Sequence, residues 1–227
     1  TQFPKDLDEI SNIQLKKETF IKIILPLVVA ENQKILNDRY KLVKIIKKKD
    51  SKRNKKEKLW LDTKFKEYKV KDKNVLELNK RMDIIPISIA LSQAAKESGW
   101  GTSRFALEGN AIFGQWTWTG TGIAPLDRSK EKTHKILRFP ILRASVKAYK
   151  KNLNTHKGYK LFREKRHSLR IKNNAISGLK LIHTLDNYAE TGKEYTKILS
   201  QIINQNSLTD FEDVILANTV VKKELNL

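Results

Sequence analysis

The segment from residue 83 to residue 101 constrains the fold of this chain more than any other part. Asp83 and Pro86 favour the start of a helix, Asp83 as a cap and Pro86 within the first turn. Residues 87–96 are apolar on nearly every side, and a helix of that composition is buried. Gly99 is a residue type that commonly ends a helix. We therefore expect a mostly helical protein with this helix at its centre.

Composition limits the classes of protein and partner. The 227 residues suit one large domain or a domain with an appendage, and the formal net charge is +21. Such a charge favours an anionic partner, which can be nucleic acid, a membrane surface or an acidic polymer such as a bacterial wall. The alternative is that the charge reflects genomic base composition alone. The absence of cysteine excludes disulfides, zinc–thiolate sites and thiol nucleophiles.

Apolar periodicity predicts long helices before the central one. A helix over residues 14–49 is expected to kink at Pro26, and the basic run 47–58, with eight basic and two acidic residues, is expected to be a solvated turn. The longest apolar run, 20–30, is shorter than the ~20 residues that cross a bilayer, so no transmembrane segment is predicted. Further helices are expected over 57–70, 142–156, 158–165, 171–185, 193–205 and 211–216, with a third short helix ending near Arg81.

Residues 110–140 differ in character, because glycines, tryptophans and β-favouring residues suggest a small hairpin lobe. The predicted fold class is therefore mainly α with a small β-hairpin lobe. We expect an N-terminal basic helical segment over 1–80, a main domain over 81–205 and a C-terminal helical tail over 206–227.

Glu97 is the strongest candidate for chemistry. It lies where the buried helix gives way to the turn Gly99-Trp100-Gly101. Desolvation disfavours the charged form of a carboxyl group and raises its pKa, and an acid that stays protonated can protonate a leaving oxygen. The alternative is a glutamate that forms a salt bridge at a helix end.

Two motifs carry a resemblance to a known family. Residues 90–101, ALSQAAKESGWG, and residues 110–114, NAIFG, resemble the peptidoglycan glucosaminidases of glycoside hydrolase family 73. Residues 139–159 and the segment YAETGKEY at 188–195 are similar to later motifs of that family, and the spacing resembles its Bax-like bacterial branch. The resemblance covers about residues 81–205. It implies a lysozyme-like fold and cleavage of bacterial peptidoglycan.

The resemblance implies that Glu97 is the general acid. A second carboxylate would come from the β-lobe, where Glu131 fits best because it lies in a polar loop shortly before the strand at 136–139; Asp127 and Glu108 are the other acids available. Glu131 can also be read as a solvated loop charge, and the substrate's own acetamido group can replace a protein carboxylate. Tyr188 matches the closing motif and would position water or the N-acetyl group, unless it is a core aromatic.

Five residues are the expected substrate contacts, and no metal or cofactor is implied. Trp116 and Trp118 would share one face of a strand and stack on sugar rings, or else pack the hairpin onto the helices. Tyr195 is expected to pack between helices. Asn110 is expected to brace the turn before the lobe and Phe113 to line the cleft floor. The substrate-binding set is Trp100, Asn110, Phe113, Trp116 and Trp118.

These features together predict a secreted or periplasmic endo-β-N-acetylglucosaminidase whose signal peptide has been removed. Its partners would be peptidoglycan glycan strands and the anionic cell envelope, with no specific nucleic acid. One rival reading is a lytic transglycosylase, which shares the lone glutamate and the lysozyme-like fold. The other is a non-catalytic basic protein that binds wall glycan or nucleic acid.

Overall fold

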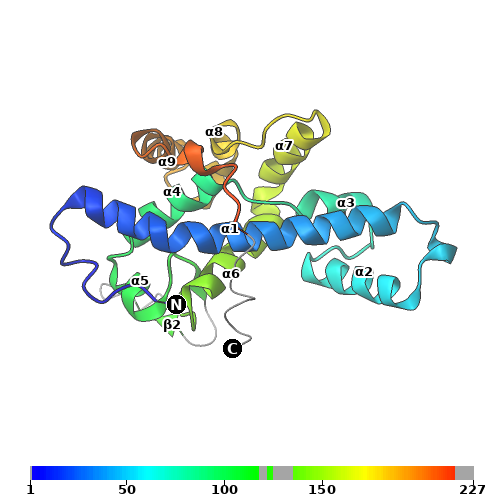
Figure 1. The fold of residues 1–227 in the computed structure, drawn as a ribbon, viewed down its shortest axis with the longest axis horizontal. Helices are drawn as coiled ribbons and strands as arrows, with labels where there is room; N and C mark the ends of the chain where they lie inside the picture. The colour runs from blue at the N-terminus through cyan, green and yellow to red at the C-terminus, as the bar shows by residue number, and fades with distance from the viewer. Residues whose placement is uncertain (1, 118–121, 125–134, 218–227) are drawn as a thin grey trace.

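The computed structural model describes residues 2–117, 122–124 and 135–217 and is mainly helical with a small antiparallel sheet, as predicted (Figure 1). The α-helices are α1 (Ile13–Ile46), α2 (Lys55–Glu67), α3 (Val75–Arg81), α4 (Ile87–Ser98), α5 (Arg104–Gly109), α6 (Leu142–Thr155), α7 (Lys160–Ile171), α8 (Gly178–Leu181) and α9 (Lys193–Gln205). Short 3-10 segments are η1 (Asp50–Lys52), η2 (Lys157–Tyr159), η3 (Ile182–Tyr188) and η4 (Leu208–Phe211). The strands are β1 (Trp116–Thr117), β2 (Gly122–Ile123) and β3 (Lys135–Leu137).

Helix α4 is the buried centre that its composition predicts. Almost every residue in it is buried, and it ends at Gly99, whose φ of 57° is left-handed. The start of α4 differs from the prediction, because Pro86 precedes the helix and Asp83 does not cap it. The Asp83 carboxylate instead accepts two hydrogen bonds from Arg170, at 2.7 and 2.6 Å.

The main core forms where the first half of α1 crosses α4 and α6, with α9 on the other side of α4 (Figure 1). Phe20, Ile24 and Val28 of α1 are buried there, and Phe3 and Leu7 from the chain's first residues join them. The helix continues past Pro26 to its end at Ile46. No helix in the described ranges has the length and apolarity that crossing a membrane requires.

The second half of α1 belongs to a separate, smaller core. Its buried residues are Ile35, Leu42, Ile45, Leu61, Phe65, Tyr68, Val70, Leu78 and Met82, from α1, α2 and α3 and the segments that follow those two helices. Because α1 contributes to both cores, the first 80 residues do not pack as a unit separate from the rest. The division of the chain at residue 80 stays a prediction.

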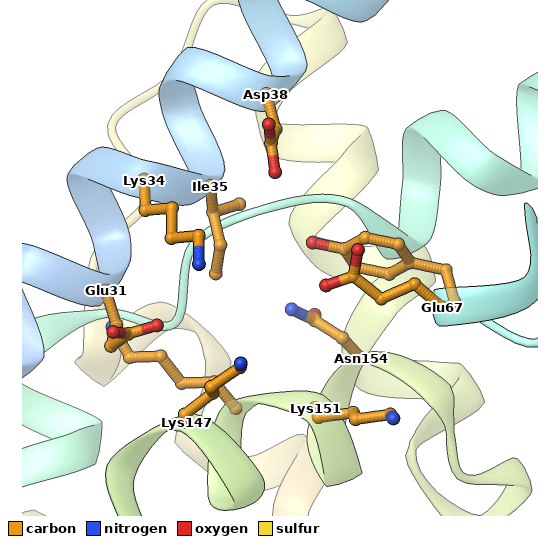
Figure 2. A pocket seen from close by; sticks show the side chains of 10 residues that line it. Glu31, Lys34, Ile35, Asp38, Glu67, Lys147, Lys151 and Asn154 are labelled. Carbon is orange, nitrogen blue, oxygen red and sulfur yellow. The ribbon is translucent and has the colours of Figure 1, made fainter. Parts of the chain in front are cut away.

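A small pocket lies between α1, α6 and the end of α2 (Figure 2). Its volume is about 50 Å³, and Lys34, Asp38, Glu67 and Lys147 are among the residues that line it. Deep beside it, the Lys150 ammonium donates to the carbonyl of Val28 and to Asn32 Oδ1, at 2.6 Å each. These bonds tie α6 to the middle of α1.

The β-lobe is a three-stranded sheet in the order β1-β3-β2, rather than a simple hairpin. Strand β3 pairs antiparallel with both neighbours, so that Ile136 lies opposite Trp116 on one side and Ile123 on the other. Ile136 packs with Ala111 and Phe139 in a small cluster of its own. Trp118, Asp127 and Glu131, which the sequence analysis placed in this lobe, lie outside the described residues.

Two predicted helices are wrong. The helix expected over 171–185 is not continuous, because α7 ends at Ile171, Asn173 adopts a left-handed φ of 52°, and helical structure resumes only at α8 and η3. The helix expected over 211–216 is replaced by η4, which ends at Phe211. In the basic run, most side chains of residues 47–58 are exposed, as predicted, and α2 begins there with a capping box between Asn54 and Glu57.

Candidate active site

The one large cleft in the described part of the chain that contains Glu97 has a volume of about 1110 Å³. It lies among the end of α4, the segment leading to β1, α6 with η2, and η3 with the start of α9. A cleft of this size accommodates several sugar rings, whereas the pocket of Figure 2 has room for little more than water. Its lining residues are Glu97, Phe113, Gly114, Gln115, Asn152, Tyr159, Asp186, Asn187, Tyr188, Ala189, Glu190, Gly192 and Lys193.

Glu97 lies in the last turn of α4 and is half-buried. Its Oε1 accepts a hydrogen bond of 2.8 Å from the Tyr195 hydroxyl. Burial raises the pKa of the Glu97 carboxyl above its ordinary value, and this effect outweighs the opposing effects of the Tyr195 hydrogen bond and the Lys96 charge. Within the described ranges Glu97 forms no salt bridge, so the helix-end ion pair that the sequence left open is not found.

The turn after α4 and the start of the β-lobe leave one face of Glu97 open. Gly99, Trp100 and Gly101 all have positive φ, so the chain reverses sharply beyond the helix. Gly114 approaches from the other side with a φ of +57°, and a Cβ atom there would lie 3.0 Å from Glu97 Oε2. Glycine at this position therefore keeps Oε2 accessible to the cleft.

A chain of buried hydrogen bonds reaches Glu97 through residues that do not line the cleft. The Tyr149 hydroxyl donates to Gln93 Oε1 at 2.5 Å, and Gln93 Nε2 donates to the Tyr195 hydroxyl at 3.0 Å. Tyr195 in turn donates to Glu97. Tyr195 packs in the main core, as expected, and its hydroxyl also binds the candidate acid, which the sequence did not indicate.

Aromatic rings form the cleft wall beside Glu97. Tyr188 stacks on Tyr195, with ring centroids 5.5 Å apart and planes 7° apart, and Phe113 stacks on Tyr149 at 3.8 Å and 4°. The Tyr188 hydroxyl donates to the Phe113 carbonyl at 3.1 Å. Burial holds the pKa of Tyr188 well above its ordinary value, so this side chain is neutral. Tyr188 and Phe113 thus lie where the sequence placed them, although the Tyr188 proton already has an acceptor.

Two predicted substrate contacts lie elsewhere. The Trp100 ring packs edge-on against Phe20, with centroids 5.5 Å apart, and the Lys17 ammonium lies 5.0 Å above it. Its left-handed backbone turns it toward α1, so it does not line the cleft. Asn110 is buried and ends α5 with a left-handed φ of 52°, and its Nδ2 donates to the Phe139 carbonyl at 3.0 Å. It braces the entry to the β-lobe, as expected, and does not line the cleft either.

The carboxylates around the cleft differ from those that the sequence analysis considered. Glu108 is exposed, pairs with Arg104 at 3.9 Å and is not a cleft residue. Asp186 and Glu190 do line the cleft, and Asp186 Oδ1 accepts a 2.9 Å hydrogen bond from Thr196 Oγ1. Their positions two residues before and after Tyr188 were the signal that could have identified them. No cluster of three His, Asp or Glu side chains in the described segments could hold a metal ion.

A half-buried acid with a raised pKa, at the end of a central helix and lining a large cleft, is the kind of site that a glycan hydrolase uses. The sequence model of the glucosaminidase family, described as mannosyl-glycoprotein endo-beta-N-acetylglucosaminidase, matches residues 72–208. The chain is 32% identical over 197 residues to protein bax of Escherichia coli strain K12, which covers 84% of this chain and 70% of that protein. The chain therefore belongs to the glucosaminidase family. No solved structure matches it.

Proposed function

We propose that the protein is a peptidoglycan hydrolase, an endo-β-N-acetylglucosaminidase, that cleaves the β-1,4 bond after N-acetylglucosamine with Glu97 as general acid. The observation that carries this proposal is the state of Glu97. Its pKa is raised by burial, one carboxyl oxygen accepts from Tyr195, and the other lies beside Gly114 in a cleft of about 1110 Å³.

In the proposed reaction Glu97 donates its proton to the glycosidic oxygen as the bond to the anomeric carbon breaks. The bonding electrons stay with the leaving oxygen, and positive charge develops on the sugar ring. A carboxylate that activates water from the opposite face lies roughly 6.5–9.5 Å from the acid. We keep Glu131 and the substrate's acetamido group as the two proposed sources of that assistance, and Asp186 and Glu190 are further carboxylates that line the cleft.

Substrate binding would use the aromatic wall and the polar side chains near it. Phe113, Tyr159 and Tyr188 line the cleft beside Asn152 and Asn187, and alternating apolar and amide groups suit the faces and hydroxyls of sugars. Trp116 and Trp118 stay proposed contacts from the β-lobe.

Digestion of purified peptidoglycan tests the proposal directly. Borohydride reduction followed by mass spectrometry of the released muropeptides should find reduced N-acetylglucosamine at the new end, with one water added per cleavage. Glu97→Gln should lower the rate by roughly 10²–10⁴-fold, because the amide cannot act as an acid. A Glu97→Gln rate within about threefold of the parent would exclude Glu97 as the acid.

The same digestion separates the rival functions. An anhydro-sugar product without added water would identify a lytic transglycosylase. Binding to peptidoglycan with no cleavage by the parent protein would identify a non-catalytic binder. Either outcome would contradict the proposed hydrolase.

The proposed location is the periplasm or the cell exterior, where the basic charge would hold the enzyme on the anionic envelope. The run 47–58 is mostly exposed, and attraction between such charges and a polyanion is screened beyond about 8–10 Å at physiological salt. Glutamine replacement of its basic residues should weaken binding to whole sacculi at low salt and leave turnover of a short soluble glycan unchanged. If turnover of the short glycan fell as much as binding to sacculi, this role of the basic run would be contradicted. The replaced residues are Lys47, Lys48, Lys49, Lys52, Arg53, Lys55, Lys56 and Lys58.

A further inference from the structure

We propose that Tyr195 is the positioning residue of Glu97: its hydroxyl occupies Oε1, so that the reactive proton is carried by Oε2 on the cleft side. This inference rests on the proposed function, in which Glu97 is the acid. It assigns different tasks to the two oxygens of one carboxyl group. It also gives a role to the three side chains behind Glu97, none of which needs to touch the substrate.

The direction of the hydrogen-bond chain supports the assignment of Oε1. The Tyr149 hydroxyl has only one proton, and its donation to Gln93 Oε1 leaves the amide NH₂ facing Tyr195. Because the Tyr195 oxygen accepts a hydrogen bond from the Gln93 amide, the Tyr195 proton is directed to Glu97 Oε1. Gln93 and Tyr149 are fully buried, so no water competes for these groups.

The surroundings of Oε2 support the other half of the assignment. A proton on Oε1 would point at the proton that Tyr195 already donates, so protonation favours Oε2. The described residues supply no hydrogen bond to Oε2, and the atom nearest to it from the β-lobe side is Gly114, which lines the cleft. After the proton leaves Oε2 for the glycosidic oxygen, the new carboxylate charge is stabilised at Oε1 by a donor already in place.

The other groups around Glu97 leave Tyr195 as its main polar contact. Helix α6 supplies Tyr149, η2 supplies Tyr159 and η3 supplies Tyr188, and burial raises the pKa of each phenol, so all three are neutral. Burial likewise raises the pKa of Tyr195, which makes it a donor rather than a base. The charged groups are Lys96 on α4 itself, whose charge lowers the pKa of Glu97, and the cleft residues Asp186, Glu190 and Lys193.

The pH dependence of kcat/KM for Tyr195→Phe tests the inference. A general acid must be protonated, so activity falls as pH rises through the pKa of Glu97. Tyr195 stabilises the carboxylate, and its removal should raise that pKa and move the alkaline limb up by about one to two pH units. The plateau kcat should fall while KM changes little, because the tyrosine does not line the cleft. Tyr40→Phe, an exposed tyrosine on α1, is the matched control and should leave the profile unchanged.

A second variant guards against an indirect effect on folding. Gln93→Met is close in volume and keeps the Tyr195 hydroxyl, but it removes the amide that orients it. Its alkaline limb should move in the same direction by a smaller amount. An unshifted limb in an active and folded Tyr195→Phe protein, or a downward shift, would overturn the inference.

A measurement without substrate separates this inference from the proposed function. In protein labelled with ¹³C at the glutamate carboxyl, the Glu97 resonance is the one that disappears in Glu97→Gln. Its titration midpoint should lie higher in Tyr195→Phe than in the parent, whether or not the protein cleaves peptidoglycan. An identical midpoint in the two proteins would reject the role of Tyr195, whereas a shifted midpoint in a protein without hydrolase activity would reject only the function.

Discussion

A half-buried glutamate lies at each end of α4, and the two glutamates differ in how many of their carboxylate oxygens accept hydrogen bonds from the protein. At the first end Glu212 accepts from the Ile87 amide at 2.8 Å, the Gly178 amide at 3.0 Å and the Ser88 hydroxyl. At the last end, Tyr195 is the one donor to Glu97 among the described residues, and the second oxygen lies beside Gly114, which lines the cleft. Burial raises the pKa of both carboxyls.

A raised pKa therefore does not by itself distinguish a catalytic acid from a structural one. Glu212 has both oxygens occupied by donors from two segments, α4 and α8, and it fixes the start of α4, where no side chain of that helix caps it. Glu97 keeps one oxygen free in a place that substrate can reach. The unoccupied oxygen and the cleft, rather than the pKa, are what support Glu97 as the proposed acid.

The same substitution at both ends should give opposite outcomes, and this is the largest effect we expect. Glu97→Gln should lose roughly 10²–10⁴-fold in turnover without a fall in Tm. Glu212→Gln should keep the turnover of the folded enzyme but lose about 1–3 kcal/mol of stability, because an amide NH₂ would face buried donors. For a chain of this length each kcal/mol corresponds to about 2–4 °C in Tm.

Thermal unfolding and peptidoglycan turnover of the two variants, measured side by side, check this prediction. A Glu212→Gln protein that melts like the parent would show that the N-terminal carboxylate is dispensable. A Glu97→Gln protein that melts well below the parent would show that its loss of activity reflects folding. Either result would remove the contrast between the two ends.

Gly114→Ala tests whether the free oxygen of Glu97 matters, with an effect that we expect to be smaller. The new Cβ would lie 3.0 Å from Oε2, and displacement of a reacting group by a fraction of an ångström costs about 10–100-fold in kcat. Gly99→Ala is the matched control, since Gly99 has the same φ of +57° but ordinary space for a Cβ atom, 3.4 Å from Thr102 Oγ1. Gly99→Ala should lose about as much stability as Gly114→Ala but much less activity. Equal loss of activity in the two variants would attribute the effect to backbone strain.

The smallest expected effect is on the pH dependence of stability. Burial raises the pKa of Glu97 in the folded protein, so the folded state binds more protons than the unfolded state above the ordinary value of about 4.3. Stability due to this group therefore falls as pH rises from that value through the folded pKa and is constant beyond it. The Tm of Glu97→Gln minus that of the parent should grow from pH 4 to pH 7 by less than about 4 °C. A difference that shrinks with pH would contradict the sign.

The sequence revealed Glu97 because its signal is local. A buried helix and a following Gly-Trp-Gly turn lie within 15 residues of one another in the printed sequence, so the helix end and the turn could be predicted together. The partners of the two glutamates could not be found this way. Tyr195 lies 98 residues from Glu97, and Glu212 lies 125 residues from Ile87. Such pairs depend on how the helices pack, which the periodicity of each helix does not encode.

Two errors of local prediction, at Trp100 and at Asn173, share one physical origin, which is backbone with positive φ. Trp100 is close to Glu97 in the sequence, but the left-handed backbone at Trp100, with a φ of 58°, turns its ring away from the cleft. Asn173, with a φ of 52°, ends the helix that apolar periodicity extended to residue 185. The Lys-Asn-Asn sequence at 172–174 was a usable signal for that break, because asparagine tolerates the left-handed region.

The shared helix α1 has a consequence for the order in which the molecule assembles. Its 34 residues are made before α6, yet two of the bonds that fasten its middle come from Lys150, 118 and 122 residues later in the chain. Helix α1 can therefore pack against α4 first, and its packing against α6 must follow. The main core is completed by contacts of large sequence separation, which form more slowly than local ones.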